Sequence, residues 1–548
     1  MSRAAAQRVP GWVRFWLVAL SGSLLTGFLP ASRGLSQSPT EPLHVRIDRA
    51  IAAAAPGPFA GPTTDEEFLR RVSLDLAGTI PTPAEVAEFT RDSQPDKRTA
   101  WIDRLLAAPT YGRRMQEYCS TLLLERRGGS PLTDAEWNQY LRESFQANKP
   151  WDRLVRELLF ADDDVQLKPA RKFLTVAGRD KNLHQQTQDV ARILLGRSIM
   201  CAQCHDHPNV ADYSQADYFG LYAYLQDKPE QARSEFESVF APGKKETWPR
   251  LPGKEPVTIP VVSQEQPAAA AEAARAHRPR LLLARDLPQP DNALFVRNTV
   301  NRLWCLLMGR GLVHPLDLHH QANPPSHPEL LDQLAAEFAR TGCDVKHLLR
   351  EIALSQSYQR SSRLPEGVTE ADAPPSSYRV FNSRLLTPEQ FGWSLLRATG
   401  NLSAWEQAGA PAKSDFGWYN YINGRIAQVP ATVPEVLDLF AGVFGNPPGE
   451  AEVDVAPTMG QALFVLNERL LLTWLEPRDG NLLARVRQIP EPAERIRELY
   501  VSILSRGPTP AETAGASEWL AAESQRGDAA LADLAWALLA SDEFRLNH

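Results

Sequence analysis

The sequence predicts a mainly α-helical protein with little β structure, built as two helical domains joined by a Pro/Ala-rich linker. Apolar residues recur at spacings of three and four, for example in 101–106, 151–160 and 330–338, which is the period of an amphipathic helix. Strand-type alternation is scarce. Between 229 and 277 the composition shifts to Pro, Glu, Lys and Ala, and no amphipathic face can be drawn, so this segment is predicted to be the linker.

Residues 1–36 have the pattern of an export signal. Arg3, Arg8 and Arg14 precede the apolar run 15–29, which ends at Pro30, as in a secretory signal peptide. If the segment is not cleaved, the run is just long enough to act as a membrane anchor. Either interpretation predicts an exported protein, periplasmic or extracellular, with membrane contact only through this segment.

The two domains are predicted over 40–228 and 278–548. Helix starts are marked at Thr82, Ser326 and Thr509, each followed by Glu three residues later, which is the pattern of a capping box. The surroundings of Thr82 and Thr509 are alike and suggest a repeated helix–loop–helix unit, although recurring cap chemistry alone would give the same match. Within the linker, only 257–262 is expected to form a short strand.

Composition and motifs exclude several classes of function. The 548 residues carry a net charge of -7 with both signs interspersed, so nucleic acid is not an expected partner. No nucleophile elbow, zinc-protease motif or phosphate-binding glycine loop is present, and no enzyme activity is indicated. Five cysteines are too few for a disulfide scaffold; Cys119 and Cys343 could pair, but nothing in the sequence requires it.

The most specific chemical signal is Cys201-Ala-Gln-Cys204-His205. Cys-x-x-Cys-His is the spacing by which a c-type haem is attached, with two thiols for the vinyl groups and an imidazole for the iron. Because haem is attached to such motifs outside the cytoplasm, the motif and the export signal support each other.

Several blocks of the sequence resemble a family of planctomycete proteins. The stretch 191–208, with 217–221 after it, resembles the cytochrome-like domain PSCyt (second type), of unknown function. The carboxyl half is similar to its usual companion, the domain PSD (first type), in blocks at 297–304, 309–313, 325–331, 355–361, 461–467 and 543–548. The resemblance implies haem attachment at Cys201 and Cys204, iron ligation by His205, and no particular reaction.

On this interpretation the protein carries haem c and serves electron transfer or redox chemistry, with an extracytoplasmic redox or envelope protein as partner. The sequence does not identify the second axial ligand of the iron. His184 is one candidate, and residues of the carboxyl domain are others, namely Met308, His319, His320 and His327; an iron with five ligands is also possible.

A non-haem alternative uses the same residues. Cys201, Cys204, His205 and His207 offer ligands suited to zinc, in which case the motif is a structural metal knuckle and the protein has an interaction role at the cell envelope. A third interpretation is a disulfide or redox dithiol, with His205 lowering a thiol pKa. His314, His319, His320 and His327 form a loose cluster that could be a second metal site, although capping or solvated roles are more common in such loops.

Overall fold

The computed structural model describes residues 41–54, 57–161, 164–226, 228–259, 276–402, 421–422, 425–426, 432–451 and 458–548. The predicted signal or anchor, residues 1–36, lies outside these ranges. Among the described residues, no helix combines the length and apolarity needed to span a membrane.

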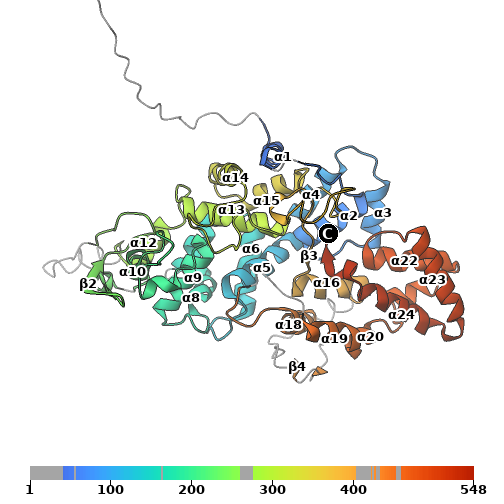
Figure 1. The fold of residues 1–548 in the computed structure, drawn as a ribbon. Helices are drawn as coiled ribbons and strands as arrows, with labels where there is room; N and C mark the ends of the chain where they lie inside the picture. The colour runs from blue at the N-terminus through green and yellow to red at the C-terminus, as the bar shows by residue number, and fades with distance from the viewer. Residues whose placement is uncertain are drawn as a thin grey trace, which may run out of the picture. The chain divides into compact units, whose positions relative to one another are not determined.

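The amino-terminal half is helical, as predicted (Figure 1). Its helices are α1 (Leu43–Ala54), α2 (Asp65–Ala77), α3 (Pro83–Arg91), α4 (Lys97–Ala107), α5 (Pro109–Leu124), α6 (Asp134–Gln146), α7 (Trp151–Leu159), η1 (Val165–Arg171), α8 (Lys172–Thr175), α9 (Leu183–Leu195), η2 (Met200–Gln203), α10 (Gln215–Tyr224) and η3 (Pro229–Gln231).

The carboxyl-terminal half is helical as well. Its helices are α12 (Pro279–Asp286), α13 (Ala293–Met308), α14 (Pro328–Arg340), α15 (Val345–Leu354), η4 (Pro375–Ser377), α16 (Pro388–Ala398), α18 (Val433–Phe444), α19 (Met459–Asn467), α20 (Arg469–Trp474), α21 (Leu482–Val486), α22 (Pro492–Leu504), α23 (Pro510–Ala522), η6 (Ser524–Arg526), α24 (Asp528–Leu539) and α25 (Asp542–Arg545).

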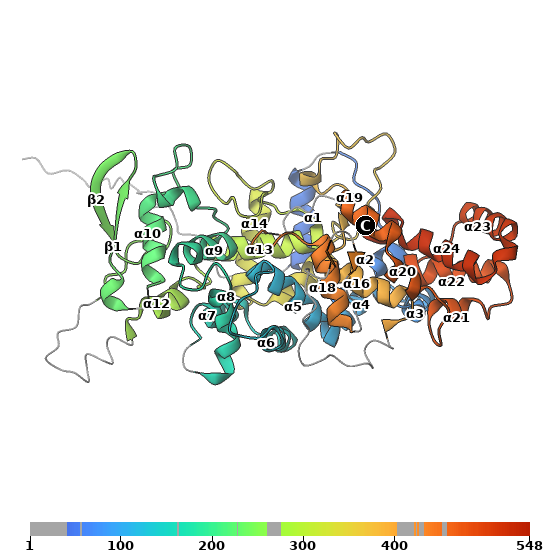
Figure 2. The ribbon, with the colours of Figure 1, turned by 90° about the horizontal axis from the view of Figure 1, so that it is seen from below.

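Strands are few and short, which confirms the predicted fold class. The described residues contain three two-stranded antiparallel sheets: β1 (Ser234–Ser238) with β2 (Ala241–Thr247), β3 (Arg384–Leu385) with β6 (Leu546–Asn547), and β4 (Tyr421–Ile422) with β5 (Arg425–Ile426). The hairpin β1–β2 lies beside α10 (Figure 2). It falls in the segment predicted as linker, and the strand expected at 257–262 is not found over 257–259, while 260–262 lie outside the described residues.

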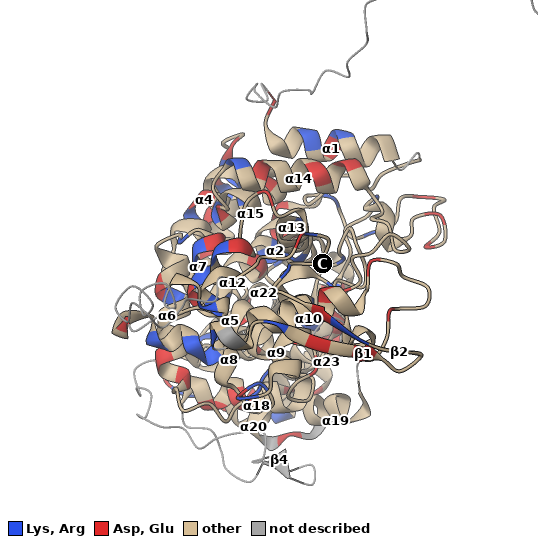
Figure 3. Cartoon of the chain, turned by 90° about the vertical axis from the view of Figure 1, so that its left-hand side faces the viewer, with Lys and Arg blue, Asp and Glu red and all other residues tan. Residues whose placement is uncertain are grey.

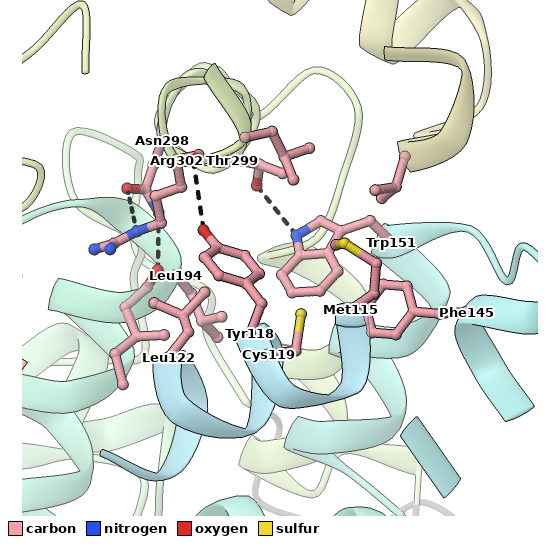
Figure 4. A pocket seen from close by; sticks show the side chains of 13 residues that line it. Met115, Tyr118, Cys119, Leu122, Phe145, Trp151, Leu194, Asn298, Thr299 and Arg302 are labelled. Carbon is pink, nitrogen blue, oxygen red and sulfur yellow. Dashed lines mark hydrogen bonds between the residues drawn. The ribbon is translucent and has the colours of Figure 1, made fainter. Parts of the chain in front are cut away.

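A buried apolar core continues from one half of the chain to the other. It contains residues on both sides of the 229–277 segment, from Leu43 through Trp151 and Leu225 to Phe381. Figure 4 shows one contact region, where side chains of α5 and α7 meet α13 around a small cavity of ≈ 20 Å³. Trp151 Nε1–H donates to Thr299 Oγ1 at 3.1 Å, and Asn298 Nδ2 donates to the carbonyl of Ile193 at 2.9 Å.

A second core is formed mainly by α16 and the helices that follow it. It also takes in Leu74 and Ile80 from the amino-terminal half. Arg70 of α2 donates to the carbonyls of Ile503 and Phe544, at 3.3 and 2.9 Å. Helix α2 therefore contacts both cores.

The predicted capping boxes at Thr82 and Thr509 are confirmed, and both precede a proline at the helix start. The two surrounding segments share their local structure: the helix before each loop is followed by a left-handed residue, Gly78 (φ 74°) and Ser505 (φ 64°).

The box predicted at Ser326 is wrong. Helix α14 has His327 as its N-cap and no side-chain cap. Pro328 takes the first helical position, where its fixed φ and missing N–H are tolerated, so Ser326 lies one residue too early to reach the helix. Its hydroxyl instead lies 3.0 Å from Nδ1 of His327.

Charges of both signs are distributed over the same helices, as α1, α4 and α7 show (Figure 3). This agrees with the interspersed charges of the sequence.

Candidate haem-attachment site

A glycine sets the direction of the chain before the Cys-x-x-Cys-His motif. Helix α9 ends at Gly196, which has φ 68°. A Cβ at this position would lie 2.6 Å from Cδ2 of His319 and 2.7 Å from Oδ1 of Asn298. Both the left-handed backbone and the close approach therefore require glycine here.

The segment that leads into the motif is held by the carboxyl half. Arg197 forms an isolated antiparallel bridge with Leu318. Ser198 N–H donates to the carbonyl of Asp317, and His319 N–H donates to the carbonyl of Gly196, both at 2.9 Å. The motif is thus positioned by residues of both predicted domains.

The two cysteines lie on one short turn. Residues 200–203 form η2, and the N–H groups of Cys204 and His205 donate to the carbonyl of Cys201 at 3.2 and 3.3 Å. Both thiols are free; Cys201 is half-buried and Cys204 is exposed. The described geometry therefore presents two unmodified thiols and an imidazole from a single turn, which is the donor set that a c-type haem needs.

The His205 ring is held in one tautomer. Its Nδ1 lies 2.8 Å from the carbonyl oxygen of Asp206. A carbonyl can only accept, so Nδ1 carries the proton and donates it, which leaves the lone pair of Nε2 available to a metal. Metal-binding histidines are commonly oriented by such a bond.

In His207 the two ring nitrogens have the opposite roles to those in His205. Its Nδ1 accepts a hydrogen bond from the N–H of Asn209 at 3.1 Å, so in the neutral ring the proton is on Nε2. Its ring packs edge-on against Tyr213, which also packs edge-on against His320. In the described part of the chain, no group of three or more His, Cys, Asp or Glu side chains is placed to hold a metal ion. The four knuckle ligands are therefore not assembled around one point, and neither is the cluster of His314, His319, His320 and His327.

Three exposed apolar side chains surround the motif, and we call them the apolar rim: Met200, Val239 and Phe240, which are 65%, 66% and 79% exposed. Met200 precedes Cys201. Val239 and Phe240 form the tip of the β1–β2 hairpin, where Val239 N–H donates to the carbonyl of Cys204 at 3.1 Å and the Phe240 ring centroid lies 4.9 Å from that of His205.

The hairpin was not predicted from the sequence, because it lies in the segment assigned to the linker. A signal was present in Ser234-Glu-Phe-Glu-Ser238, whose single large apolar side chain lies between polar neighbours. Phe236 stacks on Phe219 of α10 with ring centroids 5.0 Å apart.

His184 lies in an aromatic cluster on α9 and α10. Its Nδ1 is 2.8 Å from the hydroxyl of Tyr218, its ring centroid is 4.8 Å from that of Tyr222, and burial lowers its pKa. Gln188, four residues further along α9, donates from Nε2 to Oε1 of Gln203 within the motif at 3.3 Å, so the same face of this helix meets both the aromatic cluster and the motif.

The other candidates for the second axial ligand lie in different surroundings. Met308 is buried at the end of α13, His319 is buried with Nε2 3.4 Å from Asn301 Nδ2, and His327 packs against Tyr378. None of these three has a described contact with the motif.

The pKa of the Cys201 thiol bears on the interpretation of the motif as a redox dithiol. Burial raises the pKa of the Cys201 thiol, whereas a reactive redox dithiol depends on a lowered pKa. The arrangement of this turn fits haem better: paired free thiols, an imidazole with an available Nε2, and apolar side chains of the kind that contact a macrocycle.

The fold and the site define a mainly helical protein with a surface-exposed Cys-x-x-Cys-His turn held between its two halves. Comparison with protein families identifies the domain in each half. Residues 46–230 match the family model PSCyt2, described as Protein of unknown function (DUF1549), and residues 279–520 match PSD1, described as Protein of unknown function (DUF1553). The chain therefore combines a PSCyt2 domain and a PSD1 domain, in the order predicted from its motifs. Searches among curated proteins and among solved structures found no match.

Proposed function

We propose that this protein covalently attaches a c-type haem through Cys201 and Cys204, with His205 as iron ligand, and serves electron transfer outside the cytoplasm with a redox or envelope protein as partner. The single observation that carries the proposal is the His205 tautomer: the Nδ1–H bond to the Asp206 carbonyl leaves Nε2 free beside two free thiols. Haem would supply one-electron redox chemistry.

The residues of this chain have distinct roles in the proposal. The thiols of Cys201 and Cys204 would form the covalent links, and the Asp206 carbonyl would orient His205 as iron ligand. The apolar rim would limit the access of water to the attached group, which influences the redox potential of such centres. His184 is the candidate we favour as a second iron ligand, because Gln188 on the same face of α9 bonds to Gln203 within the motif.

The test is a visible spectrum, with pyridine haemochrome, of the chain exported in a host with an intact haem-attachment system. We expect a covalent c-type spectrum in the wild type, its retention in His207→Gln, and its loss in Cys201→Ala/Cys204→Ala. His184→Ala should keep the covalent haem and change the ligand-sensitive bands.

Folded wild-type protein without haem would overturn the proposal. Metal analysis then separates the alternatives, since a zinc knuckle would contain about one zinc per chain that is lost in His207→Gln, whereas a dithiol would contain none.

A further inference from the structure

An open cavity of ≈ 400 Å³ lies at the start of α14, and its size is within the range of small-molecule sites. Its polar lining consists of Ser326, His327, Asp372, Ser376, Ser377 and Arg379. The cavity contains no residue of the Cys-x-x-Cys-His motif.

His327 lines this cavity with an almost fully buried ring. The residue is 5% exposed, and its Nε2 is buried with no hydrogen-bond partner among the described residues. Since Nδ1 is engaged with Ser326 at 3.0 Å, Nε2 has one bond left to make in either tautomer. Because Nε2 is covered by protein atoms, a ligand in the open cavity does not reach it, and His327 contributes only to the wall of the cavity.

Arg379 brings a positive charge to the same cavity. It is 7% exposed, and its guanidinium donates only to backbone carbonyls: Nε and Nη2 to Pro58 at 3.0 and 2.8 Å, and Nη1 to Asp372 at 2.6 Å. None of the ion pairs of the described residues includes it. A guanidinium has five N–H donors, so one N–H on each terminal nitrogen is unused.

Arg70 also bonds only to carbonyls, but it lies among packed helices, whereas Arg379 lines an open space. A buried charge without a counter-ion is unfavourable. The position of Arg379 therefore indicates an external counter-ion.

The acidic side chain that lines the cavity is already engaged. Asp372 lies at the exposed rim, where its carboxylate accepts from Thr369 N–H at 3.0 Å and Thr369 Oγ1–H at 2.6 Å. These bonds, and after them the charge of Arg379, lower the pKa of Asp372.

The remaining groups favour an oxyanion. Ser376 has no hydrogen-bond partner among the described residues, and α14 begins at His327 without a side-chain cap on its first-turn N–H groups. A helix start of this kind attracts negative charge. Hydroxyls and a guanidinium without an ion pair among the described residues together match a carboxylate or phosphate group.

We propose that this cavity binds a small molecule through a carboxylate or phosphate group, with Arg379 as its counter-ion and Ser376 as a further hydrogen-bonding partner. The site is independent of haem and is a second functional centre on the carboxyl half of the chain.

The test is isothermal titration calorimetry of the full chain with inorganic phosphate and, separately, with acetate, both at constant ionic strength set by chloride. We expect saturable binding of at least one probe, and the probe that binds more tightly identifies the head group. Arg379→Gln should weaken binding about tenfold or more, the loss of a charge-assisted bond.

Two further variants keep the test decisive. Arg363→Gln replaces an exposed arginine that does not line the cavity and should bind as the wild type does. Ser376→Ala removes a hydroxyl without a hydrogen-bond partner among the described residues and should weaken binding about fivefold while leaving the fold intact. If Arg379→Gln does not fold, the affinity of Ser376→Ala tests the proposed site. Absence of saturable binding by the folded wild type, or equal affinities in all variants, would overturn the proposal.

Discussion

Asp75 carries a carboxylate in the interior, with an exposed fraction of 0%. It accepts hydrogen bonds from the hydroxyl of Tyr358 and from Asn547 Nδ2, both at 2.8 Å, and forms an ion pair with Arg384. Burial raises its pKa, because desolvation outweighs the charge of Arg384 and the bond from Tyr358. This one side chain connects α2 to three segments of the carboxyl half.

We therefore expect Asp75→Ala to lower the free energy of unfolding by about 3–5 kcal/mol, because the substitution leaves the buried Tyr358 hydroxyl and Asn547 amide without an acceptor and Arg384 without its counter-charge. Urea denaturation followed by circular dichroism measures the change. The control is Glu88→Ala, which removes an exposed ion pair with Arg104 and should cost less than about 1 kcal/mol. Equal effects of the two substitutions would contradict this role of Asp75.

His319 makes stability depend on pH. Burial, followed by the charges of Arg302 and Arg197, lowers its pKa from 6.5 to about 3. The unfolded chain then binds a proton that the folded chain excludes, so stability is present above pH 6.5 and is lost as the pH falls toward 3.

Between pH 7.5 and 5 the wild type should lose about 2 kcal/mol through His319. His319→Gln should lack this part of the pH dependence, whereas His207→Gln should keep it. Urea midpoints measured across this range test the expectation, and parallel pH profiles of wild type and His319→Gln would refute it.

At the scale of the elements, helix starts depend on where proline falls. Thr82 and Thr509 each directly precede a proline and cap their helices. At α14 the residue before the proline is His327, which provides no side-chain cap.

Thr82→Ala should therefore destabilise the protein by about 1 kcal/mol, since the bonds of the capping box are lost. Ser326→Ala removes no helix cap and should change the free energy of unfolding by less than about 0.5 kcal/mol. Thermal or urea unfolding of the two variants, measured side by side, provides the comparison. The prediction is contradicted if Ser326→Ala lowers the free energy of unfolding as much as Thr82→Ala does.

These elements show what the sequence could predict. Helix period, the two capping boxes and the Cys-x-x-Cys-His turn were predictable, because each depends on residues close in the chain. The rest depends on partners far along it: the hairpin tip that meets His205, the Asp317 carbonyl that holds Ser198, and the union of Ser326, Ser376 and Arg379 around one cavity. No local pattern specifies such pairings.

At the scale of the whole molecule, the two halves share a core across the segment predicted as linker. A change of composition marks that segment, but it does not indicate whether the helices on either side pack together. Asn298 of α13 contributes to this shared region, since it donates to the Ile193 carbonyl of α9.

We expect α9 and α13 to unfold in one transition. In hydrogen exchange at increasing urea, peptides from both helices should lose protection at the same midpoint, and Asn298→Ala should lower both midpoints together through a loss of about 1–3 kcal/mol. Asn138→Ala, which removes a bond with Gln116 in the amino half, is the matched control. Separate midpoints for α9 and α13 in the wild type would contradict the prediction.

The bridge between Arg197 and Leu318 has a practical consequence for protein engineering. The loop that carries the paired thiols takes its shape from backbone bonds supplied by the other domain, so the two domains are not interchangeable modules. A chimera that joins a PSCyt2 domain from one parent to a PSD1 domain from another should therefore take the segments on both sides of this bridge, 196–214 and 312–323, from the same parent.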